Sequence, residues 1–178
     1  MKFAVRLFLV LMLSLILAAC ARETRDEGTE TQTPPPTVTP PVTEVETDRV
    51  DPNNFADSRN LDNPQSLLSQ REIYFDFDRS DVQARFLPVI RAHAAYMQAN
   101  SSARVLLEGH ADERGSREYN LGLGERRGNS VQDLARADGA GSNQLEVVSY
   151  GEERPVCRQS SDNCWERNRR VEIVYTAR

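Results

Sequence analysis

The sequence is poor in lysine and in the residues that bind transition metals. Its 178 residues include three cysteines and two histidines, too few for a multi-ligand cluster of the zinc-finger kind. Lys2 is the only lysine, so the other basic residues are all arginine. The 27 acidic residues outnumber the 22 basic ones, which argues against a non-specific nucleic-acid-binding protein, because such a protein needs a basic surface. With 39% hydrophobic residues, the chain has enough apolar material for one ordinary domain plus accessory segments.

The first residues have the layout of a secretory signal peptide. Lys2 and Arg6 form a short positive region, and an apolar run follows from residue 7 to residue 17. This run is shorter than the ~20 residues that span a bilayer. We therefore predict that residues 1–19 are a signal peptide.

The next residues predict lipidation. Residues 17–20 (LAAC) resemble the bacterial lipobox, whose cysteine thiol takes up diacylglycerol. The alternative is an ordinary signal peptide followed by a chance cysteine. We expect Cys20 to carry acyl chains, more than one of which is needed for firm anchoring. Ala21 follows the cysteine where an aspartate would favour inner-membrane retention, so the sequence favours the outer membrane.

Residues 20–68 are predicted to be the lipidated cysteine and a disordered tether. They include the Thr/Pro-rich stretch TQTPPPTVTPPVTEVET and have an excess of acidic residues. Such a segment buries too little apolar surface to offset the entropy lost on ordering. Its function would be to let the anchored domain search the space below the membrane.

Residues 69–178 are predicted to form one α/β domain. Alternating or apolar runs predict strands, and the 3.6-residue period predicts two helices. Pro88 should kink the first helix or mark its start, and Asp78 or Ser80 is its expected N-cap. The expected order is β-α-β-α-β-β, an α+β sandwich with the helices on one face of a mixed sheet. The strands are Arg71–Phe77, Ala103–Gly109, Leu145–Tyr150 and Val171–Thr176; the helices run from about Val82 to Met97 and from Glu118 to Asp138.

Four motifs in this domain resemble a known family. They are YFDFDRSDV, EGHADERGSREYNLGLGERRGNSV, SYGEERP and NRRVEIVY, and together they are similar to the OmpA-like peptidoglycan-binding domain. With the lipobox and tether in front, the chain is most similar to the peptidoglycan-associated lipoproteins of the Tol–Pal system. The resemblance implies a non-enzymatic protein of the outer membrane whose domain lies in the periplasm. Its implied partners are peptidoglycan, TolB and TolA, with a role in drawing the outer membrane inward during cell division.

The resemblance also implies a binding site. Members of the family hold the meso-diaminopimelate of an uncrosslinked stem peptide, whose free end carries an ammonium and a carboxylate on one carbon. Asp112 matches the aspartate that binds the ammonium, and Arg127 matches the arginine that binds the carboxylate. Without the resemblance, the two would be read as a turn residue and a solvated helix residue. The other residues that match the pocket are Asp76, Phe77, Arg114, Asn120, Leu123, Arg169 and Arg170.

An enzyme or a metal site is the sharpest alternative. His110, Asp112 and Glu113 lie together, but one histidine with two acids in a short loop is a weak ligand set. No serine or cysteine lies in a recognisable nucleophile motif, and Gly122 and Gly124 lack the spacing of a phosphate-binding loop. We therefore expect no catalytic residues, no metal and no cofactor other than the lipid, and we attribute the glycines to close packing of helix against sheet.

Two cysteines remain once Cys20 is lipidated. Cys157 and Cys164 bracket the loop CRQSSDNC, and in an oxidising periplasm we expect them to form a disulfide. Two free thiols are the alternative. Closure of so short a loop would stabilise the domain by about 2.5 kcal/mol in the chain-entropy model.

Overall fold

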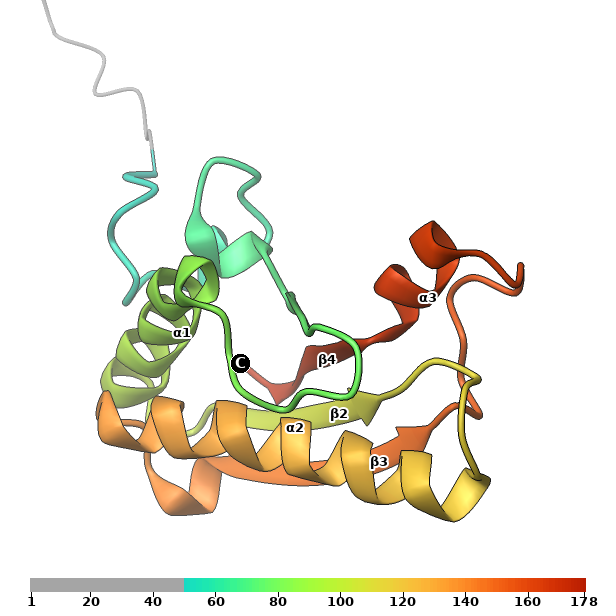
Figure 1. Cartoon of the computed structure of the whole chain (residues 1–178). Helices are drawn as coiled ribbons and strands as arrows, with labels where there is room; N and C mark the ends of the chain where they lie inside the picture. The colour runs from blue at the N-terminus through green and yellow to red at the C-terminus, as the bar shows by residue number, and fades with distance from the viewer. Residues whose placement is uncertain (1–49) are drawn as a thin grey trace, which may run out of the picture. The chain divides into compact units, whose positions relative to one another are not determined.

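The structure is a computed structural model that describes residues 50–178. The predicted signal peptide, Cys20 and most of the predicted tether lie outside these residues. The described part is an α/β domain with one mixed sheet, as the sequence predicts (Figure 1). Within it, no helix has the length and apolar character needed to cross a membrane.

Four strands form the sheet in the spatial order β1-β4-β2-β3. β4 is antiparallel to β1 and to β2, whereas β2 and β3 are parallel. The predicted strand over residues 71–77 is cut short, because the chain turns out of the sheet near Asp78, whose φ of 56° is left-handed. The strands are β1 (Glu72–Tyr74), β2 (Arg104–His110), β3 (Leu145–Gly151) and β4 (Arg170–Ala177).

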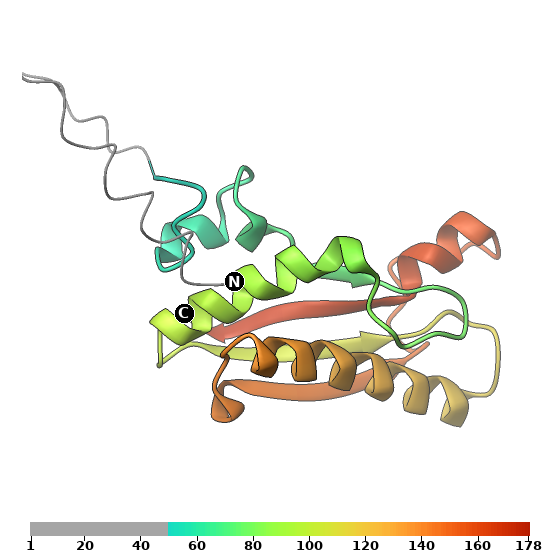
Figure 2. The same ribbon diagram turned by 60° about the vertical axis from the view of Figure 1, so that its left-hand side comes forward.

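Two helices, α1 (Leu87–Ala99) and α2 (Arg117–Ala137), lie side by side over one face of the sheet (Figure 2). Side chains of β2 alternate between the two faces, as a strand requires. Val105 and Leu107 are buried in the core beneath the helices, while Glu108 is half-buried on the other face. The prediction that the helices occupy one face is confirmed.

The first helix begins later than predicted. Neither Asp78 nor Ser80 caps it, because a 3-10 turn at Ala84–Phe86 precedes α1, which has no side-chain cap. Pro88 lies in the first turn of α1, where a missing N–H costs no helical hydrogen bond. The interpretation of Pro88 as a marker of the helix start is therefore confirmed.

A third helix interrupts the last connection of the chain. The sequence predicts only a loop between the last two strands, but α3 (Asp162–Asn168) lies there, and the order becomes β-α-β-α-β-α-β. A helix of seven residues is too short to display a helical period clearly. Cys157 and Cys164 are joined by a disulfide, which closes the segment that leads into α3.

The domain also starts earlier than the predicted boundary at residue 69. Leu61 and Leu68 lie in two short 3-10 turns and are buried in the same core as the sheet and α1. The side chain of Asn60, also buried, donates hydrogen bonds to the carbonyl oxygens of Asp51 and Asn54. Residues 50–68 are therefore part of the domain, and their assignment to the tether is wrong.

Glycines let α2 approach the sheet closely. A Cβ at Gly124 would lie 2.4 Å from Ser149 Oγ, and one at Gly128 would lie 2.5 Å from a methyl carbon of Val147. Larger residues would push the helix away from the strands. Close packing therefore explains Gly124 and Gly128, but the same prediction is wrong for Gly122, where a Cβ would meet only Arg126 Nη1 at 3.3 Å.

Candidate functional site

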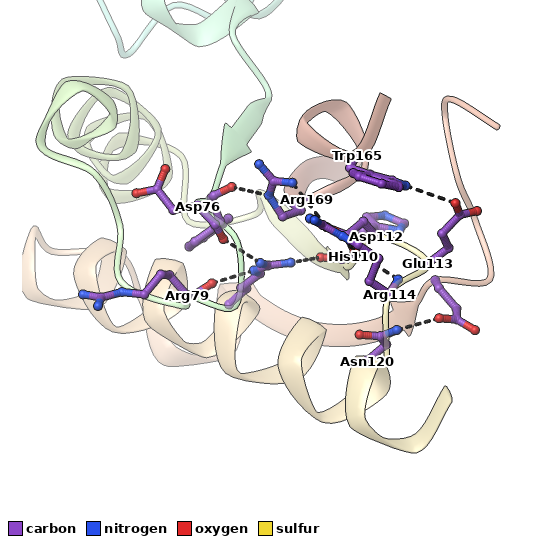
Figure 3. Close-up of polar contacts among 12 residues, drawn as sticks. Asp76, Arg79, His110, Asp112, Glu113, Arg114, Asn120, Trp165 and Arg169 are labelled. Carbon is purple, nitrogen blue, oxygen red and sulfur yellow. Dashed lines mark hydrogen bonds and ion pairs between the residues drawn. The ribbon is translucent and has the colours of Figure 1, made fainter. Parts of the chain in front are cut away.

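A pocket of about 230 Å³ opens where β1 and β2 end. Its walls come from the loops that follow these two strands, from the first half of α2 and from the residue that precedes β4 (Figure 3). The structure brings most of the predicted site residues together here: Phe77, Asp112, Arg114, Asn120, Leu123, Arg127 and Arg169. Asp78, Ala111, Gly115 and Tyr119 complete the lining.

Arg127 is fully buried and ties three backbone segments together. Its Nε donates to the carbonyl oxygen of Arg79 at 2.8 Å, and its Nη1 donates to that of His110 at 2.8 Å. Its Nη2 donates to the carbonyl oxygen of Asp76 at 3.1 Å. A guanidinium has more N–H donors than these three contacts use, so Arg127 keeps donors for a ligand.

The charge of Arg127 has no carboxylate partner. Among residues 50–178, none of the ion pairs includes it. Burial, with a smaller effect of nearby Arg169, lowers the pKa of Arg127 to about 10, so the group stays protonated at neutral pH. A buried cation without an anion is costly, and the pocket therefore favours a ligand that brings an anionic group.

Asp112 supplies a buried negative charge in the same pocket. Its Oδ1 accepts hydrogen bonds from the backbone N–H and the Nε of Arg114, at 3.1 and 3.0 Å. Its Oδ2 accepts from Arg114 Nη2 at 2.7 Å and from Arg169 Nη1 at 3.2 Å (Figure 3). Burial alone would raise the pKa of this carboxyl, but the hydrogen bonds from the two arginines hold it below its ordinary value.

An aromatic rim surrounds Arg114. The guanidinium carbon lies 4.0 Å from the ring centre of Phe77 and 4.2 Å from that of Trp165, so two rings flank one cation. The indole N–H of Trp165 donates to Glu113 at 3.1 Å, and the hydroxyl of Ser160 donates to the same carboxylate oxygen at 2.7 Å. These contacts connect the segment after Cys157 to the mouth of the pocket.

Two predicted site residues lie elsewhere. The carboxylate of Asp76 accepts from Gln83 and faces a neighbouring groove, although its backbone carbonyl holds Arg127. The side chain of Arg170 lies 3.4 Å from Glu172, on the sheet face away from the helices. Arg169 and Arg170 are consecutive, and neighbouring side chains of an extended chain point in opposite directions. Only Arg169 can therefore reach the pocket.

Tyr119 and Asp78 also line the pocket, although the sequence motifs did not mark them as site residues. The Tyr119 hydroxyl donates to the Asp78 carboxylate and so links α2 to the loop after β1. Tyr119 is 46% exposed in the first turn of α2, where its backbone N–H donates to the N-cap residue Ser116. Its position in the sequence, an aromatic residue four positions after the GHADERG motif, could have marked Tyr119 as a pocket residue.

The pocket places the buried guanidinium of Arg127 and the buried carboxylate of Asp112 in one lining, an arrangement that suits a small group with both charges. The OmpA family model matches residues 74–169, which contain all the pocket residues named above. The chain belongs to the OmpA family, as the resemblance predicted.

Individual relatives agree with this family. The peptidoglycan-associated lipoprotein of Pseudomonas putida is 43% identical over 121 residues, which cover 68% of this chain and 72% of that protein. That of Legionella pneumophila is 45% identical over 103 residues, which cover 58% of each chain. The crystal structure of the peptidoglycan-associated lipoprotein from Burkholderia pseudomallei matches with a TM-score of 0.64 and 39% identity, over 65% of this chain and 98% of that one. All three are named peptidoglycan-associated lipoproteins, and the chain belongs with them to a non-enzymatic family, as predicted.

Proposed function

We propose that this chain is a lipoprotein that binds peptidoglycan non-covalently through the meso-diaminopimelate of an uncrosslinked stem peptide. The observation that carries the proposal is the buried guanidinium of Arg127, which forms no ion pair within residues 50–178 and shares one pocket with the carboxylate of Asp112. The free end of diaminopimelate bears one carboxylate and one ammonium. Arg127 suits the carboxylate, because its planar group can donate more than one hydrogen bond, and Asp112 suits the ammonium.

The names of the similar proteins support the wall as the ligand. Relatives from Pseudomonas putida and Legionella pneumophila, and the Burkholderia pseudomallei structure, are all called peptidoglycan-associated lipoproteins. In this proposal Phe77, Arg114, Asn120, Leu123 and Arg169 shape the pocket, and Asp76 acts through its backbone. No catalytic group, metal or cofactor takes part in binding.

The proposal extends to location and partners. Acyl chains on Cys20 anchor the protein in the outer membrane, and the domain faces the periplasm. There it acts with TolB and TolA to connect the outer membrane to the wall and to draw it inward during division. The motifs shared with the Tol–Pal lipoproteins support this role. The alternative is a wall-binding lipoprotein of the same family that has no Tol partner, and a pull-down with TolB separates the two.

Co-sedimentation with purified sacculi tests wall binding. The protein should sediment with sacculi, and Asp112→Asn should weaken its binding by about tenfold or more, because a hydrogen bond to a charged group is lost. Asp133→Asn is the matched control, since Asp133 is exposed on α2 outside the pocket. Equal sedimentation of the two variants would show that Asp112 is structural.

Competition tests the identity of the ligand. A soluble stem peptide that contains meso-diaminopimelate should release the protein from sacculi, whereas the same peptide with lysine in that position, whose free end bears an ammonium but no carboxylate, should not. Release by both compounds would show that Arg127 does not read the carboxylate. Arg127→Lys keeps a cation but loses the planar donors, and should remove the preference for diaminopimelate, whereas Arg126→Lys on the exposed side of α2 should retain it.

A further inference from the structure

The sheet face that α1 and α2 leave uncovered carries a second cluster of polar side chains. Glu108 on β2 and Glu172 on β4 are direct partners in the antiparallel register. His110, two residues further along β2, is on the same side as Glu108. One ligand atom from each of these three side chains lies within 4.8 Å of the others. None of the three lines the pocket.

His110 is the unusual member of this cluster. The residue is 1% exposed, and neither of its ring nitrogens has a hydrogen-bond partner in the part of the chain that the structure describes. Buried imidazole nitrogens are normally bonded. Its ring stacks on Tyr150, with centroids 5.7 Å apart. A register shift between Gly109 and His110 lies beside it, and such irregularities re-aim side chains.

The two carboxylates also lack a compensating contact of ordinary strength. Like charges directly opposite each other in a sheet destabilise it. Arg170 Nη2 lies 3.4 Å from Glu172 Oε2 and Arg154 Nη1 lies 4.0 Å from Glu108 Oε2, both longer than the ~2.8 Å of a strong charged hydrogen bond. Arginines in this position suit the outer shell that orients ligating carboxylates.

We propose that Glu108, His110 and Glu172 form a site for a divalent cation of the zinc class on the uncovered face of the sheet. One imidazole nitrogen and two carboxylate oxygens are a ligand set that suits zinc and similar ions, whereas magnesium and calcium prefer oxygen ligands alone. Small side-chain rotations bring the three atoms from their present spacing to bonding distance. The ion offsets the repulsion between the carboxylates and gives His110 a partner.

The sequence predicts no metal because the acids next to His110 in the chain are a weak ligand set. Asp112 and Glu113 are indeed unsuited as ligands here, because Asp112 is bonded to two arginines and Glu113 to Trp165. The carboxylates that face His110 belong instead to Glu108, two residues earlier on β2, and to Glu172 on the neighbouring strand β4. Pairing between β2 and β4 creates the cluster.

Calorimetric titration of the untagged full chain in detergent with Zn²⁺ tests the site. One ion should bind per chain. Glu172→Gln should weaken binding by about tenfold or more and His110→Gln should abolish the site. Glu146→Gln is the matched control, because Glu146 lies on the same face on β3 beside Leu106 and outside the cluster. Absence of Zn²⁺ binding, or equal affinity in the Glu172 and Glu146 variants, would overturn the proposal.

Imidazole NMR signals give a second readout that does not depend on a variant. Zn²⁺ should shift the ring signals of His110 and leave those of His93 in place. His93 is an internal control, because both of its ring nitrogens are already bonded, to the Tyr175 hydroxyl and the Gln70 carbonyl. A shift of His93 with no shift of His110 would place the ion elsewhere and refute the site.

Discussion

Arg114 and Asp112 form a two-pronged ion pair inside the pocket, from Nε to Oδ1 at 3.0 Å and from Nη2 to Oδ2 at 2.7 Å. With the Arg114 backbone N–H and with Arg169, the contacts fill the roughly four acceptor positions of a carboxylate. An ammonium that binds Asp112 must therefore displace a donor. The Arg114 side chain is 32% exposed and that of Arg169 is 10% exposed, so Arg114 is the one that can move.

Trp165 should report this movement, because it is the only tryptophan of the chain and flanks the Arg114 guanidinium. We expect a diaminopimelate-containing muropeptide to change its fluorescence as Arg114 leaves the ring. In Arg114→Ala the change should be absent, and in Arg117→Ala, which alters an exposed arginine paired with Glu153, it should remain. An unaltered response in Arg114→Ala would show that Arg114 stays in place.

Arg127→Ala should unfold more easily than the wild type. The substitution leaves three backbone carbonyl groups without their donor, and we expect a loss of about 2–4 kcal/mol in the free energy of unfolding. Arg126→Ala, one position along on the exposed side of α2, should change it by less than about 0.5 kcal/mol. Urea denaturation measures both. Similar values would mean that the Arg127 contacts contribute little, and Arg127→Ala would then be usable in wall-binding assays.

Leu68→Ala tests whether the segment before β1 belongs to the domain. Leu68 is fully buried in the core, and removing such a side chain costs about 2–5 kcal/mol. The exposed neighbour Gln65 should tolerate alanine. Thermal unfolding of the two variants makes the comparison, and a stable Leu68→Ala protein would restore the tether boundary at residue 69.

Reduction of the disulfide should lower the melting temperature. The loop closed by Cys157 and Cys164 contributes about 2.5 kcal/mol through the entropy of the unfolded chain. The double substitution to serine should reproduce the loss and be insensitive to dithiothreitol. If the wild type melts at the same temperature with and without dithiothreitol, the stabilising role is wrong.

His93 should make stability depend on pH. Burial lowers the pKa of His93 to about 4, from about 6.5. The unfolded chain therefore takes up the proton first, and stability is full above pH 6.5 and falls as the pH drops toward 4. From this histidine we expect a loss of about 2 kcal/mol between pH 7 and pH 5 without divalent cations.

The variant His93→Gln isolates this contribution. It should lose about that much of the pH dependence measured by urea denaturation between pH 7 and pH 5. His110, whose pKa is lowered to about 3 by burial and by Arg170 and Arg154, accounts for a further part. An unchanged slope in His93→Gln would mean that folding does not shift the pKa of this ring.

Local patterns in the sequence predicted most of the regular structure. The alternating pattern of β2 and the helical period of α2 each extend over several repeats. Because of this, the predicted bounds of both elements differ from those in the structure by about one residue. Motif matching, not periodicity, selected Asp112 and Arg127. That match placed both residues in one pocket without indicating that Arg127 is wholly buried.

The features that the sequence did not reveal depend on contacts between distant segments. Residues 50–68 look polar because Leu61 and the Leu67–Leu68 pair are few and far apart among polar residues, and only α1 and the sheet give Leu61 and Leu68 a core to enter. Arg169 and Arg170 look equivalent in the sequence. The start of β4 at Arg170 directs their side chains to different sides, Arg169 to the pocket and Arg170 to Glu172. Glu172 meets Glu108 through strand pairing alone.

The place where the chain enters the domain has a mechanical consequence. Asn100, just before β2, donates from its side chain to the Ala56 carbonyl at 3.1 Å, whereas the loop that lines the pocket follows the other end of β2. Tension between a membrane anchor and a wall ligand would thus run lengthwise along the sheet, and the chain would pass it to β1 and its pairing with β4. Peeling of residues 50–68 before the sheet yields would add roughly 60 Å of reach, an extension that single-molecule pulling from Cys20 against a bound muropeptide would register as a first step.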